Sequence, residues 1–99
     1  MSQDTVRVIA RLRAKPGKEV DLRSLAADLI APTRKEAGCI RYELLENETD
    51  PAELTFVEEW RDGDTLNAHL ATPHVQYAVS RCPELLLGEL DLRRYKLVG

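Results

Sequence analysis

The chain has 99 residues, which fits one small domain, and its 43% apolar and 31% charged residues are ordinary for a globular protein. A net charge of −3 argues against a nucleic-acid-binding surface. No apolar run approaches the roughly 20 residues of a membrane span, and the N-terminus lacks a signal-peptide layout. We therefore expect a cytoplasmic protein that binds neither nucleic acid nor membrane.

The first element is predicted over residues 6–14, where apolar residues alternate with arginines as in a half-buried strand. Residues 18–36 follow with apolar residues at helical spacing, which predicts a helix with one apolar face. Pro32 lies inside this pattern and should kink or break the helix near its end, because proline has no backbone N–H to donate. Gly38 is placed to end the helical segment.

Two strands are predicted next, over residues 39–46 and 53–61, and the turn formers between them indicate a hairpin. Aspartates at 62–64 can cap a short helix that reaches about Leu70.

The last part of the chain is predicted to hold a further helix and a final strand. Thr72 is placed as the cap of this helix and Pro73 as its first residue, and Pro83 should interrupt it. The final strand is predicted over residues 89–97.

This order of elements, β-α-β-β-α-β, predicts a ferredoxin-like α+β domain with a four-stranded antiparallel sheet and helices on one face. The residues predicted to face the helices are Val6, Val8, Ala10, Leu12, Ile40, Tyr42, Leu44, Leu54, Phe56 and Trp60. The opposite face, which includes Cys39 and Arg41, mixes apolar residues with charges of both signs. Such a face can meet its own copy about a two-fold axis, so we expect a homodimer in which two sheets form an α/β barrel.

Glu58 is the most informative candidate for chemistry. Alternation turns it toward the helices, between Phe56 and Trp60. A carboxylate on an apolar face is costly unless it is paired, and burial raises its pKa toward that of a general base. A structural hydrogen bond to Tyr42, to a helix N-terminus or to His69 would explain the same placement, and both readings stay open.

His69 and His74 are the only histidines, and each is a candidate acid/base group because imidazole exchanges protons near neutral pH. A capping or surface role suits each of them equally. The proline between them prevents an i, i+4 pair on one helix. A metal would need a third ligand, with Glu58 and Cys82 as candidates, but no chelating spacing is present and we expect no metal.

The candidates for contact with a substrate are aromatic. Trp60 could stack on a flat ring while its N–H binds an oxygen. Tyr42 and Tyr77 could offer hydroxyl groups, since Tyr77 lies one turn after His74 and could face the same cavity. Phe56 shares the inward register, and simple core packing explains all four equally well.

Several cofactor signatures are missing from the sequence. It contains no glycine-rich phosphate loop and no strand-to-helix nucleophile turn, so we expect no flavin, nicotinamide or nucleotide cofactor. Cys39 and Cys82 are expected to be free thiols, as in a reducing cytosol.

Three segments, KPGKE (15–19), PTRKEAGCIRYEL (32–44) and FVEEWRDGDTLNAHLATPH (56–74), resemble the antibiotic-biosynthesis-monooxygenase domain family, most of all its small quinol-monooxygenase-type members. The resemblance runs from about Val6 to Leu97 and implies a dimeric α/β barrel. It implies oxidation of a quinol or related aromatic by dioxygen without metal or organic cofactor. It also implies that a histidine of the AHLATPH segment lines the pocket.

Members of this family differ in their reactions, so alternatives remain. Haem-degrading relatives pair an asparagine on the first strand with a tryptophan and a histidine, and residues 6–14 contain no asparagine, which argues against haem degradation. A carbonyl isomerase of a small metabolite and a non-catalytic ligand-binding dimer remain open. For the leading function we expect Glu58 or one of the two histidines to act as the base, with Trp60, Tyr42 and Tyr77 around the substrate ring.

Overall fold

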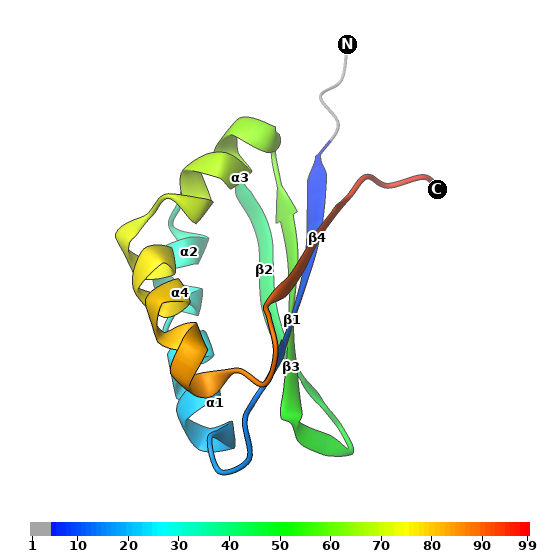
Figure 1. The fold of residues 1–99 in the computed structure, drawn as a ribbon. Helices are drawn as coiled ribbons and strands as arrows, with labels where there is room; N and C mark the ends of the chain where they lie inside the picture. The colour runs from blue at the N-terminus through cyan, green and yellow to red at the C-terminus, as the bar shows by residue number, and fades with distance from the viewer. Residues whose placement is uncertain (1–4) are drawn as a thin grey trace.

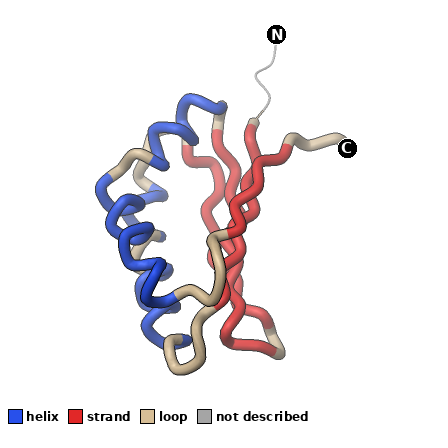
Figure 2. Tube along the Cα trace, in the orientation of Figure 1, coloured by secondary structure: helices blue, strands red, loops and turns tan. Residues whose placement is uncertain are grey.

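The computed structural model describes residues 5–99 and shows one antiparallel sheet with all helices on one of its faces (Figures 1 and 2). The elements in chain order are β1 (Val6–Arg13), α1 (Glu19–Ala27), α2 (Ile30–Arg34), β2 (Cys39–Asn47), β3 (Asp50–Trp60), α3 (Gly63–Leu70), α4 (Pro73–Leu85) and β4 (Asp91–Tyr95). The strand order is β2-β3-β1-β4. The predicted ferredoxin-like α+β fold is thus confirmed.

The core lies between the sheet and the helical layer. Strand β1 runs antiparallel to both β3 and β4, and its pairing with β3 sets Val8 opposite Glu58 and Ala10 opposite Phe56. Alternate residues of these strands pack against Leu22 of α1 and Leu66 of α3, both fully buried. Among residues 5–99, no helix has the length and apolar character needed to cross a membrane.

The helix predicted over residues 18–36 is broken into α1 and α2, with Asp28 and Leu29 between them. The break lies one turn before Pro32, whose ring crowds the carbonyl four residues earlier and whose nitrogen cannot donate to it. The predicted effect of Pro32 is therefore confirmed. Pro83 behaves differently from its prediction, because α4 continues through it to Leu85 before it ends.

The prediction that Ile40 faces the helices and Cys39 the opposite side is wrong. Cys39 lies opposite Trp60 and Arg41 opposite Glu59, so Ile40 is an extra, unpaired residue in β2. This bulge reverses the alternation, which leaves Ile40 55% exposed while Cys39 packs against the core. Cys39 and Cys82 are both free thiols, as expected.

Candidate functional site

A small cavity of about 80 Å³ lies under the helical layer, against the covered face of the sheet. Its lining is mainly apolar and is completed by Glu58, His69 and the ring of Tyr42; the other lining residues are Ala10, Leu12, Leu29, Phe56, Leu70, Val75, Ala78, Val79, Cys82, Leu90 and Leu92. An apolar hollow with a few convergent polar groups is typical of a small-molecule site.

Glu58 lies at the floor of this cavity, on β3, and is only 5% exposed. Its Oε1 accepts a hydrogen bond of 2.9 Å from Nε1 of Trp60. Burial raises the pKa of Glu58 to about 7, with a smaller push from the charge of Glu36, while the hydrogen bond from Trp60 acts in the opposite direction. A carboxyl group with this pKa can take up or release a proton near neutral pH.

Aromatic rings surround this carboxyl group and the neighbouring imidazole. The ring of Trp60, which is fully buried, lies 4.5 Å from the ring of His69 between centroids. Tyr42 packs at 4.9 Å from Phe56 and at 5.6 Å, edge-on, from His69. Burial and the nearby charge of Glu58 raise the pKa of Tyr42, so its hydroxyl stays protonated.

The two histidines meet at a residue that the sequence did not single out. Oε2 of Glu36 lies 2.8 Å from Nδ1 of His69 and 2.7 Å from Nε2 of His74. Burial lowers the pKa of His69, and the hydrogen bond and charge of Glu36 oppose this shift. Glu36 follows α2 and lies 33 residues before His69, so no spacing rule connects them.

The N-terminal caps of α3 and α4 fix the positions of the two histidines. Asp62 accepts a hydrogen bond of 2.9 Å from the backbone N–H of Thr65, which fixes the start of α3 and hence the position of His69 in its last turn. Thr72 caps α4, and its hydroxyl donates to the carbonyl of His69 at 2.7 Å. This short turn brings His74 back beside His69.

Glu36, His69 and His74 could in principle hold a cation, in place of the expected third ligands Glu58 or Cys82. Their three ligand atoms span up to 4.8 Å. Zinc bonded to nitrogen and oxygen at about 2.0–2.1 Å needs neighbouring ligand atoms roughly 3.3 Å apart. The two nitrogens lie 2.8 and 2.7 Å from Oε2 of Glu36, which are hydrogen-bond distances, and a cation would require these three atoms to rearrange.

Tyr77 does not share the cavity with His74, contrary to the expectation from its helical spacing. It is 57% exposed on α4, where its hydroxyl accepts a hydrogen bond of 3.0 Å from Arg81. His74 is also absent from the cavity lining and contacts the site through Glu36. The structure thus brings Glu58, His69, Tyr42 and Phe56 together at the cavity lining and leaves Tyr77 outside. Trp60 packs against His69 and donates to Glu58, but it is not part of the lining.

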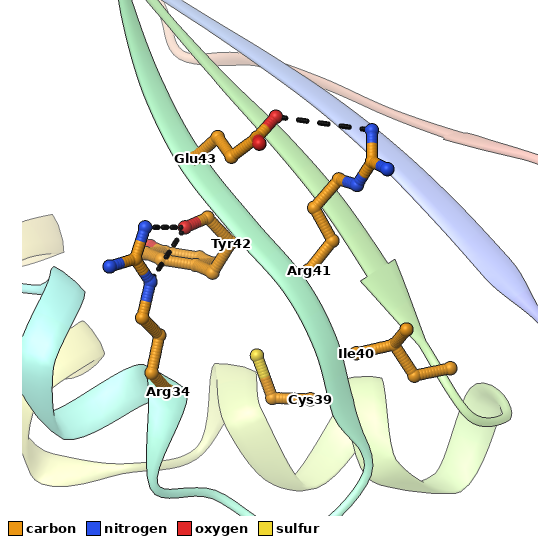
Figure 3. Close-up of a pocket in the computed structure, with 6 residues that line it drawn as sticks. All are labelled: Arg34, Cys39, Ile40, Arg41, Tyr42 and Glu43. Carbon is orange, nitrogen blue, oxygen red and sulfur yellow. Dashed lines mark hydrogen bonds and ion pairs between the residues drawn. The ribbon is translucent and has the colours of Figure 1, made fainter.

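A larger hollow of about 400 Å³ lies outside this site, along edge strand β2 (Figure 3). There Arg34 donates two hydrogen bonds, of 2.9 and 3.1 Å, to the backbone carbonyl of Tyr42, and Arg41 lies 4.0 Å from Glu43. The guanidinium of Arg34 fastens α2 to the sheet, and the hollow itself is open and polar. We regard the cavity around Glu58 as the site because it combines burial with groups that exchange protons.

Comparisons of the sequence and of the structure with known proteins point to the same family. The family described as antibiotic biosynthesis monooxygenase matches residues 5–81. The putative monooxygenase Rv0793 of Mycobacterium tuberculosis is 38% identical over 81 residues, covering 82% of this chain and 79% of that protein. Its solved structure superposes with a TM-score of 0.90, 33% identity and 96% coverage of both chains.

Two further relatives extend the match. The putative monooxygenase YcnE of Bacillus subtilis is 32% identical over 88 residues, covering 89% of this chain and 93% of that protein. An uncharacterized protein of Synechocystis, sll1783, is 32% identical over 96 residues, covering 97% of this chain. The chain spans 65% of the length of this last relative.

Proposed function

The chain belongs to the antibiotic biosynthesis monooxygenase family, and from this premise we propose that it oxidises a small quinol or related phenol with dioxygen, without a metal or organic cofactor. The observation that carries the proposal is a buried carboxyl group and a buried imidazole, Glu58 and His69, at one aromatic-walled apolar cavity. Such a cavity favours a flat substrate with a few hydroxyl groups.

The chemistry begins with a proton transfer from a substrate hydroxyl to a base of the cavity, Glu58 or a histidine. The resulting phenolate passes one electron to dioxygen, which gives a phenoxyl radical and superoxide. These combine through a new carbon–oxygen bond to a peroxide. Loss of the ring hydrogen as a proton, with cleavage of the oxygen–oxygen bond, releases water and leaves a carbonyl group. A hydroquinone and one dioxygen thus give a hydroxyquinone and one water.

The size of the cavity favours a single ring. An apolar cavity of about 150 Å³ admits benzene, whereas this one measures about 80 Å³. Even one ring therefore needs its walls to move apart. Val79 of α4 and Leu90 before β4 line the cavity and are 47% and 36% exposed, which makes this side its rim.

We also propose that the protein acts as a cytoplasmic homodimer that pairs through the uncovered face of the sheet. Ile9 and Val57 lie opposite each other on this face and are half-buried, and Leu45 is 50% exposed there. Nε of Arg7 on this face is buried without a hydrogen-bond partner. Apolar area and an unsatisfied donor on one face fit a second copy of the sheet.

Sedimentation tests this dimer directly. Val57→Glu sets a carboxylate opposite Glu43 on the proposed interface and should yield monomers, whereas Val20→Glu on α1, at a position 76% exposed, should leave the dimer intact. A monomeric wild type, or a dimer that withstands Val57→Glu, would contradict the assembly.

The test of activity is oxygen uptake by metal-free protein with a panel of hydroquinones. Glu58→Gln should lower the rate about 10²–10⁴-fold, the range of general acid–base catalysis, while its neighbour variant Glu59→Gln should keep most of it. Absence of uptake above buffer across the panel, with Glu58→Gln indistinguishable from wild type, would remove the proposal.

A further inference from the structure

The carboxylate of Glu36 is shared between the two histidines, and the three side chains differ in their access to solvent. The side chain of His69 is 3% exposed, that of Glu36 14% and that of His74 25%. Both imidazoles use the same oxygen, Oε2, so a single acceptor binds one buried and one half-buried ring.

We propose that Glu36 is a positioning residue that makes His69, rather than His74, the proton-accepting histidine of the cavity. The inference rests on the proposed function and deepens it by assigning roles within the site. His69 lines the cavity, whereas His74 is not part of its lining and binds Glu36.

The hydrogen bond fixes the state of the His69 ring. A carboxylate only accepts hydrogen bonds, so a neutral His69 bound to it must carry its hydrogen on Nδ1. Nε2 is then the nitrogen with a free lone pair, and it is the only one left to take a proton from a ligand. When Nε2 accepts that proton, the positive charge of the ring lies against Glu36, which stabilises it.

His74 has a supporting part in this arrangement. Its Nε2 donates to the same Oε2 and holds the carboxylate toward His69. A flip of the His69 ring would put a carbon where Nδ1 now lies, so the ring cannot exchange its nitrogens without losing the hydrogen bond of 2.8 Å to Glu36. The ionisable neighbours of His69 are Glu36 and His74 at its Nδ1 side and Tyr42 and Glu58 at the cavity.

The experiment is nitrogen NMR of the imidazoles, which is simple to assign because the chain has only two histidines. In wild-type protein at neutral pH, His69 should show the tautomer with hydrogen on Nδ1. Glu36→Gln should populate the other tautomer, since an amide can also donate, and should lower the titration midpoint of His69 by roughly one pH unit. Glu43→Gln, at an exposed glutamate of β2, serves as the matched control.

Hydrogen on Nε2 of His69 in the wild type would overturn the proposal, and so would an unchanged tautomer and midpoint in Glu36→Gln. The wild-type measurement needs no variant and therefore holds even if Glu36→Gln fails to fold. In oxygen uptake, His69→Gln should lose about 10²–10⁴-fold and His74→Gln less than tenfold, and the reverse order would contradict the assignment. Because the spectra need no substrate, they stand apart from any failure to find quinol oxidation.

Discussion

Two neighbouring glutamates of β3 have opposite surroundings. Glu58 lies on the covered face, 5% exposed, with its carboxylate bound to an indole N–H in an apolar cavity. Glu59 lies on the uncovered face, where its carboxylate is 3.7 Å from the guanidinium of Arg7. Burial under the helical layer is the main cause that raises the pKa of Glu58 to about 7.

The contrast between these two glutamates extends to the two faces of the whole sheet. The uncovered face carries a ladder of ion pairs between β1 and β3, namely Arg7–Glu59, Arg11–Glu53 and Arg13–Asp50. In the single chain the arginines of these pairs remain open to solvent, and ion pairs of this kind contribute little to stability. The covered face carries the apolar core. The buried polar side chains among residues 5–99 are Thr33, Glu58, Thr65 and His69, and of these Glu58 and His69 line the cavity.

The largest expected effect tests whether the covered face holds the fold together. Leu54 is 2% exposed on that face, and Leu54→Ala should lower the free energy of unfolding by about 2–5 kcal/mol. The matched change Leu45→Ala, on the uncovered face, should cost the dissociated monomer less than about 1 kcal/mol, because Leu45 is 50% exposed in the single chain. Urea unfolding at one low protein concentration measures both, and similar losses in the two variants would break the comparison.

The second effect concerns pH. Folding raises the pKa of Glu58 above its value in the unfolded chain, so the folded state binds this proton more tightly. Stability should therefore fall as pH rises from about 4.5 to 7, by a total on the order of 3 kcal/mol, and then level off. His69, whose pKa is lowered, contributes the opposite slope.

The informative quantity is accordingly the difference between wild type and Glu58→Gln in urea unfolding at several pH values. Glu58→Gln should remove the downward slope, while Glu59→Gln should retain it. Parallel curves for wild type and Glu58→Gln would show that the fold does not perturb this carboxyl group.

The smallest effect compares two glycines with the same backbone. Gly38 and Gly17 have φ angles of +85° and +84°, so alanine is strained at both. At Gly38 an added Cβ would also lie 2.4 Å from Cγ2 of Thr65 on α3, whereas nothing lies within 4 Å at Gly17. Gly38→Ala should therefore cost roughly 1–3 kcal/mol more than Gly17→Ala in thermal or urea unfolding. Equal costs would mean that α3 is not packed tightly on this turn.

Alternation and helical spacing predicted the order of elements and the inward placement of Glu58, because both follow from local periods. Ile40 was misplaced because one extra residue in a strand reverses which side chains face the helices, and nothing in the residue types reveals such a bulge. Tyr77 was misplaced because neighbours on a helix need not point into one cavity. Glu36 was missed because its contact with two histidines depends on how the turn after α2 packs against α3 and α4, which no spacing along the chain encodes.

The hydrogen bond between Trp60 and Glu58 has a practical consequence. Trp60 is the single tryptophan of the chain, it is fully buried, and its ring packs beside His69. Its fluorescence therefore comes from one spot in the protein and senses gain or loss of charge on the carboxylate and the imidazole beside it. The chain carries its own optical reporter, which can follow ligand entry or ionisation at this spot without any added label.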